Sequence, residues 1–254
     1  MEIIYLIIFF ILGTILGSIY TVIGLRLPKE EKVTNLSYHC ETCHHKLASK
    51  DIIPIFSYIL LKGKCRYCQQ KIDIQELLME IFSGVLFAVA FYSFGFSLEL
   101  LIALGIISLL IIITVSDLTY LIIPDEVLLF FSLYFILVQY MREGLLGVGI
   151  HLATGVFLFL LMYSIMYLGE KILKKESLGG GDVKMMFLFG LVLDPLLGTL
   201  TIFLGSLFAL PMSLFLLYKN KENVIPFGPF LLMAFAFMYF TKLTPTGLLS
   251  WLGF

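Results

Sequence analysis

The sequence predicts an all-α polytopic membrane protein with about eight transmembrane helices and one small polar domain outside the bilayer. Hydrophobic residues make up 60% of the chain and charged residues only 14%, whereas a soluble domain carries roughly 25% charged residues. The mean hydropathy is +1.01. Polar residues gather in one long segment, about residues 26–75, and most of the remaining chain consists of apolar runs. A soluble globular protein is therefore excluded.

Eight apolar stretches are candidate spans, because a spanning helix needs roughly 20 mostly apolar residues. They cover about residues 3–24, 77–95, 99–116, 126–141, 147–169, 184–196, 198–217 and 226–241. The sixth is short and adjoins the seventh, so seven helices are an alternative. The first lacks a basic start and an A-x-A cleavage site, and we expect it to be a transmembrane helix and not a cleaved signal. The predicted domains are 1–25, 26–75 and 76–254.

The basic residues are distributed unevenly among the predicted loops. If eight helices alternate in direction, fifteen of the 17 Lys and Arg residues lie on one side of the membrane, leaving Arg142 and Lys242 on the other. Because basic loops stay in the cytoplasm, we expect the polar domain to be cytoplasmic and the N-terminus to be outside.

All the cysteines lie in the polar domain. They form two C-x-x-C pairs separated by 21 residues: Cys40, Cys43, Cys65 and Cys68. This spacing, one residue outside the usual window, is typical of a zinc-ribbon site. A reducing cytoplasm disfavours disulfides, and a domain of about 50 residues needs extra stabilisation. We predict a structural Zn²⁺ with four thiolate ligands; thiol chemistry is the alternative. His44 and His45 are expected to be exposed neighbours.

Two acids, Asp117 and Asp182, lie at predicted membrane boundaries. The predicted topology places both at the cytoplasmic ends of their helices. A solvated interfacial role is the alternative for any single acid, but an unpaired acid near lipid is usually functional. Three glycines precede Asp182, and such a run lets backbone approach another group closely. We expect Gly179, Gly181 and Lys184 to support a site containing both acids.

The two carboxylates suggest a specific chemistry. Two such groups a few ångströms apart cannot both ionise cheaply, so the pair retains one proton near neutral pH. The ionised member takes a proton from an attacking water, and the protonated member stabilises the charge that develops on a scissile carbonyl. This is the chemistry of an aspartyl protease, with Asp117 and Asp182 as its catalytic residues. The sequence does not assign the two roles.

Other acidic residues compete for these roles. Asp125 follows Pro124 and has the position of a helix N-cap. Glu80 lies one turn inside the predicted second helix, where it could line a polar cavity. His151 is expected at the outer interface.

Six segments between about residues 17 and 231 occur in a recognisable order. They are Gly17–Pro28, the tetracysteine loop, Glu80, Asp117–Asp125, Gly179–Lys184 with its G-x-G-D pattern, and Ile225–Phe230. Together they resemble the bacterial type IV prepilin peptidases, which are bifunctional leader peptidases and N-methyltransferases of the GxGD type. The family usually has Asn where this chain has Thr21, outside both aspartate segments.

The resemblance implies an enzyme of the bacterial inner or cytoplasmic membrane. It would cleave the leaders of prepilins and pseudopilins at the cytoplasmic face and methylate the new N-terminal residue with S-adenosylmethionine. Its partners would be these substrates and membrane lipid, with no nucleic acid. No glycine-rich cofactor loop is visible, so the methyl-donor site is not located; Glu80 is a candidate.

Three alternatives stay open on the sequence alone. They are a transporter with an acidic relay, an assembly factor with a zinc-stabilised domain, and a peptidase without methyltransferase activity. A separate hypothesis concerns Pro226–Pro229, whose prolines and glycine prevent a regular helix start. We expect this stretch to flank the active site and to offer backbone groups to substrate, although it could be a simple start signal for the last helix.

Overall fold

The computed structural model describes residues 2–31, 43, 45–46, 53–72, 74–174, 178–218 and 225–242. Within these residues the regular elements are helical, and extended backbone occurs in isolated bridges such as the one between Lys64 and Lys71. The chain divides into two units, Met1–Phe96 and Ser97–Phe254. The all-helical part of the prediction is confirmed for the described residues.

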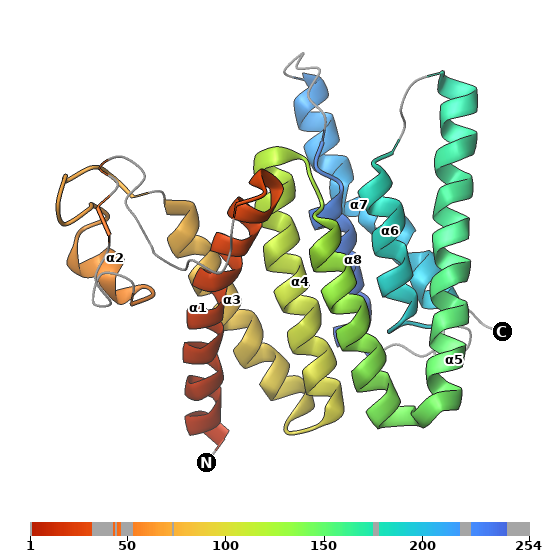
Figure 1. Ribbon diagram of the computed structural model, residues 1–254, viewed down its shortest axis with the longest axis horizontal. Helices are drawn as coiled ribbons and strands as arrows, with labels where there is room; N and C mark the ends of the chain where they lie inside the picture. Colours follow the sequence, from red (N-terminus) through yellow and green to blue (C-terminus); the bar gives the residue numbers. More distant parts are fainter. Residues whose placement is uncertain are drawn as a thin grey trace. The chain divides into compact units, whose positions relative to one another are not determined.

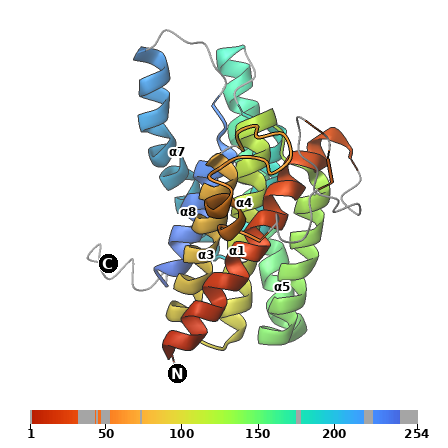
Figure 2. The same ribbon diagram turned by 90° about the vertical axis from the view of Figure 1, so that its left-hand side faces the viewer.

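The first unit is built on two long helices. Its elements are α1 (Glu2–Arg26), the 3-10 turn η1 (Leu27–Lys29), α2 (Phe56–Leu60) and α3 (Ile74–Phe94). Figure 2 shows α1 crossing α3. A Cβ added to Gly13 of α1 would lie 2.9 Å from the Cα of Gly84 in α3. Small residues let the backbones approach this closely, as in membrane helix pairs.

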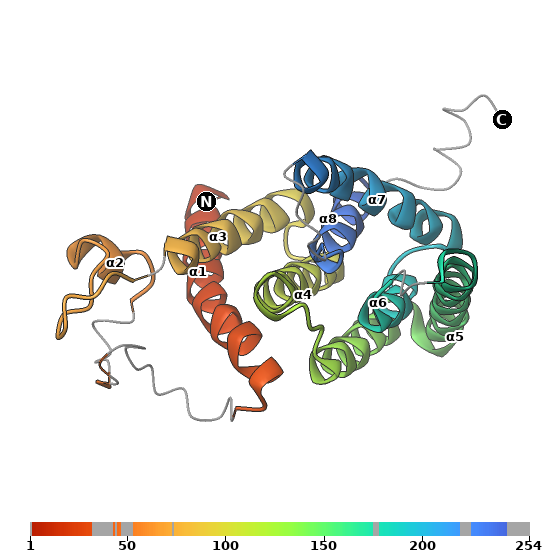
Figure 3. The same cartoon turned by 90° about the horizontal axis from the view of Figure 1, so that it is seen from above.

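The second unit holds the remaining helices. They are α4 (Leu98–Tyr120), α5 (Asp125–Leu173), α6 (Gly180–Gly190), α7 (Pro195–Tyr218) and α8 (Gly228–Phe240). Seen from above, α6 lies between α5 and α8, and α4 lies beside α8 (Figure 3). The rings of Phe189 in α6 and Phe235 in α8 stack with centroids 4.3 Å apart, and both are fully buried. The short helices thus form the centre of this unit.

Helix α5 joins two of the predicted spans, 126–141 and 147–169. It runs through 49 residues, but Gly144 has φ 71° and ψ −169°, which is not helical. A non-glycine residue adopts such a positive φ only with strain. The break that the sequence predicts between these spans falls at Gly144, where one arm of α5 ends and the other turns back beside it (Figure 1).

Among the residues that the structure describes, five helices are long and apolar enough to cross a membrane: α1, α3, α4, α5 and α7. Helices α6 and α8 are apolar but have only 11 and 13 residues. At 1.5 Å per residue they extend about 16 and 20 Å, less than the hydrocarbon thickness. The structure therefore supports a polytopic membrane protein, whereas the count of eight spans stays a prediction.

Candidate active site

Asp117 lies in the last turn of α4, where the chain leaves the helix abruptly. Leu121 takes a left-handed conformation (φ 56°), and its N–H donates to the carbonyl of Asp117 at 3.0 Å. The hydroxyl of Ser116 donates to the carbonyl of Ile122 at 2.5 Å. Asp117 is only 6% exposed. These local bonds fold the 121–124 segment back over the end of α4, beside the carboxylate.

Asp182 lies in the first turn of α6. Helix α6 starts after Gly179, which has extended backbone (φ −69°, ψ 136°), and the N–H of Asp182 donates to the carbonyl of Gly179 at 3.1 Å. Asp182 is also 6% exposed. Its Oδ1 is buried and has no hydrogen-bond partner among the described residues. A buried polar oxygen without a partner is uncommon and calls for an explanation.

The two aspartates meet at the same end of the second unit, and Ile123 lies between their segments. The C-terminal end of α4 and the N-terminal ends of α6 and α8 all lie at the upper end of this unit in Figure 1. A Cβ on Gly181 would lie 2.8 Å from the Cβ of Ile123, and one on Gly228 would lie 3.3 Å from its Cδ1. The carboxylates of Asp117 and Asp182 interact electrostatically.

Gly228, the first residue of α8, contacts Asp117 directly. Its N–H donates to Asp117 Oδ2 at 3.1 Å in a buried hydrogen bond. A Cβ at this position would lie 2.9 Å from the same oxygen. The expectation that this stretch flanks the aspartates agrees with this contact. The amide of Gly228 itself, however, is bound by Asp117 and is not free to pair with a substrate.

Lys184 forms an ion pair with Asp125 close to the aspartates. Its Nζ lies 2.7 and 2.8 Å from the two carboxylate oxygens of Asp125, and both side chains are largely exposed. The prediction that Asp125 caps a helix is wrong: the N-cap of α5 is Pro124, and no side chain caps this end. Asp125 is instead drawn to the ammonium group of Lys184, and the pair joins the start of α5 to α6.

Glu80 belongs to the first unit. Its Oε2 accepts the N–H of Ile55 at 2.8 Å, and its carboxylate also accepts a bond from the Ser18 side chain. Ile55 has a left-handed φ of 63°, which is strained for a β-branched residue. Glu80 therefore ties the polar segment to α1 and α3.

Three of the four predicted zinc ligands come together. The sulfur atoms of Cys43, Cys65 and Cys68 lie within 4.8 Å of one another. The turn is closed by two bonds, from the N–H of Cys65 to the Gln70 carbonyl at 2.8 Å and from the N–H of Gln69 to the Cys65 carbonyl at 3.0 Å. Cys40 lies outside the described residues, as does His44.

His45 stands beside the cysteine cluster. Its ring packs on Tyr67 with centroids 3.7 Å apart. Clustered thiols suit a soft or borderline metal such as Zn²⁺, so the described donor set fits the predicted ion.

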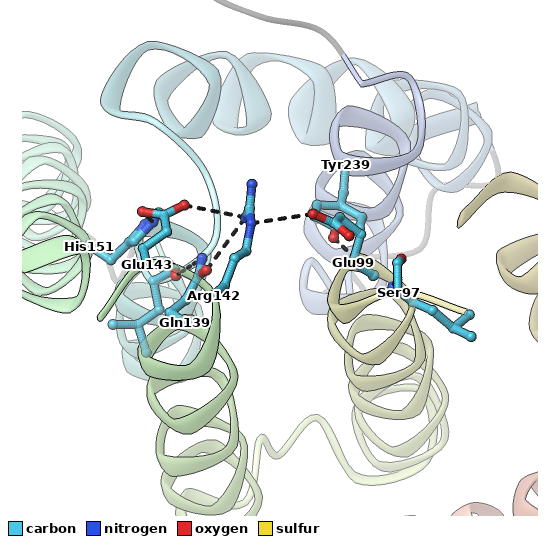
Figure 4. Close-up of polar contacts among 9 residues, drawn as sticks. Ser97, Glu99, Gln139, Arg142, Glu143, His151 and Tyr239 are labelled. Atoms are coloured by element: carbon cyan, nitrogen blue, oxygen red, sulfur yellow. Dashed lines mark hydrogen bonds and ion pairs between the residues drawn. The ribbon is translucent and has the colours of Figure 1, made fainter. Parts of the chain in front are cut away.

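A polar cluster at the opposite end of the second unit was not predicted as such (Figure 4). Arg142 lies 3.5 Å from Glu99 and 3.6 Å from Glu143, which in turn lies 3.3 Å from His151. Tyr239 donates its hydroxyl to the carbonyl of Glu99 at 3.0 Å. The cluster joins the start of α4, the kink of α5 and the end of α8. From the sequence we expected only an interfacial His151 here, because Glu99 and Tyr239 lie far from Arg142 in the chain.

The fold and this site define a class, an all-helical membrane protein with two interacting, buried aspartates at one end of a bundle. Within that class the sequence comparisons are specific. Residues 11–94 match the bacterial peptidase A24 N-terminal domain, and residues 104–214 match the type IV leader peptidase family. The chain belongs to this family of leader peptidases.

Relatives along most of the chain agree with this assignment. A Bacillus subtilis (strain 168) protein is 35% identical over 192 residues, covering 73% of each chain. One from Vibrio cholerae is 28% identical over 260 residues, covering 95% of this chain and 98% of its own. One from Myxococcus xanthus is 32% identical over 199 residues, covering 75% and 57%. Each is named prepilin leader peptidase/N-methyltransferase. No solved structure matches the chain.

Proposed function

We propose that this protein is a bifunctional prepilin peptidase that cleaves the leaders of prepilins and pseudopilins and methylates the new N-terminus with S-adenosylmethionine. The family and the names of its relatives support the activity. The observation that carries the proposal is the interacting pair of buried carboxylates, Asp117 and Asp182. A transporter or assembly factor is not favoured, because the relatives are named as enzymes.

The proposed cleavage uses the two aspartates as a water-activating pair. One carboxylate takes a proton from water while the water oxygen attacks the scissile carbonyl. The other, protonated, donates to the carbonyl oxygen and stabilises the charge that forms there. Burial strengthens both interactions, since electrostatic forces weaken in water. Gly179 and Gly181 support this site by letting the backbone pass close to Asp182 and Ile123, and Lys184 braces α6 against α5.

The proposed topology has eight crossings of the inner membrane. Its division is 1–25 as the first helix, 26–75 as a cytoplasmic zinc-binding domain and 76–254 as the membrane peptidase domain. Asp117, Asp182 and the basic loops then share the cytoplasmic side. The kink at Gly144, which breaks α5 into two arms, supports counting that helix as two crossings. The short helices α6 and α8 each supply one more.

We assign a structural Zn²⁺ to Cys40, Cys43, Cys65 and Cys68. The clustering of the three described thiols supports the assignment. A bound zinc ion would stabilise this small domain by cross-linking its two hairpins.

The methyl donor is proposed to bind in the first unit near Glu80. S-adenosylmethionine carries a cationic sulfonium and an amino group, both of which a carboxylate attracts. One oxygen of Glu80 accepts the Ile55 N–H. Equilibrium binding of S-adenosylmethionine to wild type and Glu80→Gln tests this placement; equal affinity would exclude it.

The experiment that tests the whole proposal combines the purified protein in lipid with a prepilin, with and without S-adenosylmethionine. Mass spectrometry of the product should show a shortened chain without the cofactor and the same chain plus one CH₂ with it. Cleavage without the added CH₂ would leave a peptidase alone. An intact prepilin in both reactions would overturn the proposal.

A further inference from the structure

The two aspartates differ in their surroundings, and this difference assigns their roles. We propose that Asp117 is the ionised member of the pair and the general base, and that Asp182 carries the shared proton and acts as the acid. The inference rests on the proposed peptidase function and concerns only how the work is divided within that site.

The surroundings of Asp117 stabilise its ionised form. Its Oδ2 accepts the buried N–H of Gly228 at 3.1 Å. An N–H donor stabilises a carboxylate more than a neutral carboxylic acid, because hydrogen bonds to an ionised acceptor are the stronger ones. The donor is a main-chain amide fixed at the start of α8, so it cannot turn away when the charge changes. Gly228 is therefore a positioning residue for the base.

The surroundings of Asp182 favour its protonated form. Its Oδ1 is buried without a hydrogen-bond partner among the described residues, so a negative charge there would be the least compensated of the pair. A proton on this oxygen removes that charge and supplies a donor that can point to Asp117 or to a substrate carbonyl.

Two contacts favour an ionised Asp182, and neither reaches Oδ1. The N-terminal dipole of α6 favours an anion in its first turn, and the backbone of Gly179 interacts with the carboxylate on the Oδ2 side. The dipole effect is normally smaller than the cost of a buried charged oxygen without a donor. The cost of charge on the unpartnered Oδ1 therefore outweighs these contacts, and the shared proton stays on Asp182.

This assignment gives a balanced reaction. Asp117 removes a proton from water as the water oxygen bonds to the carbonyl carbon, and Asp182 transfers its proton to the carbonyl oxygen, giving a neutral gem-diol. The C–N bond then breaks. Asp117 gives its proton to the leaving nitrogen, and Asp182 recovers one from a gem-diol hydroxyl. The products are a free acid and a free amine, and both carboxyl groups return to their starting states.

Infrared difference spectroscopy at neutral pH tests the assignment without relying on activity. The wild-type minus Asp182→Asn spectrum should contain the C=O stretch of a protonated carboxylic acid. The wild-type minus Asp117→Asn spectrum should instead contain the bands of a carboxylate. The reverse pattern, or no protonated-acid band in either difference, would overturn the proposal. Cleavage by the wild-type sample is measured in parallel, so loss of the peptidase function itself is recognised separately.

A second measurement serves if an aspartate variant does not fold. In Gly228→Ala the N–H remains, but the added Cβ would lie 2.9 Å from Asp117 Oδ2 and push that oxygen off its donor. The acid limb of the pH profile of kcat/KM should move to higher pH, because Asp117 loses stabilisation of its ionised form. In Gly180→Ala, where nothing lies within 4 Å of the added Cβ, the acid limb should stay at its wild-type pH. Identical limbs in the two variants would contradict the assignment.

The other charged groups of the site do not change this expectation. The described residues around the pair contribute Lys184 from α6 and Asp125 from α5, which bind each other. Residues 225–230, which lead into α8, carry no charged side chain.

Discussion

At the scale of single residues, the glycines before Asp182 differ in the space beside them. A Cβ on Gly181 would lie 2.8 Å from the Ile123 Cβ, whereas a Cβ on Gly180 would meet nothing within 4 Å. Ile123 also borders Gly228, so displacing it disturbs the setting of both aspartates. The two neighbouring glycines therefore provide a test and its matched control.

We predict that Gly181→Ala lowers kcat/KM for prepilin by about 100-fold, the loss that accompanies a small misplacement of a catalytic group. Gly180→Ala should stay close to wild type. Both variants need to elute and melt like wild type for the comparison to hold. Equal activity of the two variants would show that the Gly181–Ile123 contact does not position the site.

The sequence indicated Asp117, Asp182 and the glycines before Asp182 as candidate site residues, because a charge in an apolar setting and a run of glycines are local signals. It did not predict that Gly228 would bind Asp117, since 111 residues separate them. It also placed Asp125 as a cap, because the position after Pro124 has that signature. Lys184, 59 residues away, binds Asp125 instead, and no local pattern records such a pairing.

At the scale of elements, hydropathy located most helices well. The predicted spans 3–24, 77–95 and 99–116 correspond to α1, α3 and α4 within a few residues. The run 184–196 was misplaced: α6 begins earlier and ends at Gly190. Apolar residues continue beyond that point as a turn, where Val192 donates its N–H to the Phe189 carbonyl at 3.1 Å. Hydropathy records burial and does not mark the residue at which a buried helix ends.

The cluster around Arg142 gives a prediction at this scale. Arg142→Gln should lower the free energy of unfolding by about 1 kcal/mol, because the side chains of Arg142, Glu99 and Glu143 are each about a third or more exposed and solvent weakens such pairs. The melting temperature in detergent should fall by about 3 °C, with cleavage unchanged because the aspartates lie at the other end. Lys171→Gln, which removes a charge from an exposed part of α5, is the control. Equal melting of both variants would argue against a structural role for the cluster.

At the scale of the whole molecule, the chain combines one unit that holds the clustered cysteines with a second unit that carries the aspartates. Each unit has its own packed helices, and the family matches at residues 11–94 and 104–214 fall within them. Because the cysteines and the aspartates lie in different units, the sequence could predict a metal site from one set and a peptidase site from the other independently. Its domain division at residue 75 rests on polarity alone and stays a prediction.

Metal removal tests the role of the cysteines. Purified wild type should contain about one zinc ion per chain, and Cys65→Ser should lose it, because a structural site needs all four ligands. His45→Ala should keep the metal, since its ring packs on Tyr67. Elemental analysis of the three proteins decides the matter. Zinc retained by Cys65→Ser, or lost by His45→Ala, would contradict the proposed ligand set.

We propose that cleavage requires both Asp117 and Asp182. The most direct measurement compares prepilin cleavage by the reconstituted wild type, Asp117→Asn and Asp182→Asn, two nearly isosteric changes. We expect both variants to fold like wild type and each to lose at least about 10⁴-fold in rate, as when one member of a catalytic unit is removed. Near-normal cleavage by either folded variant would contradict it.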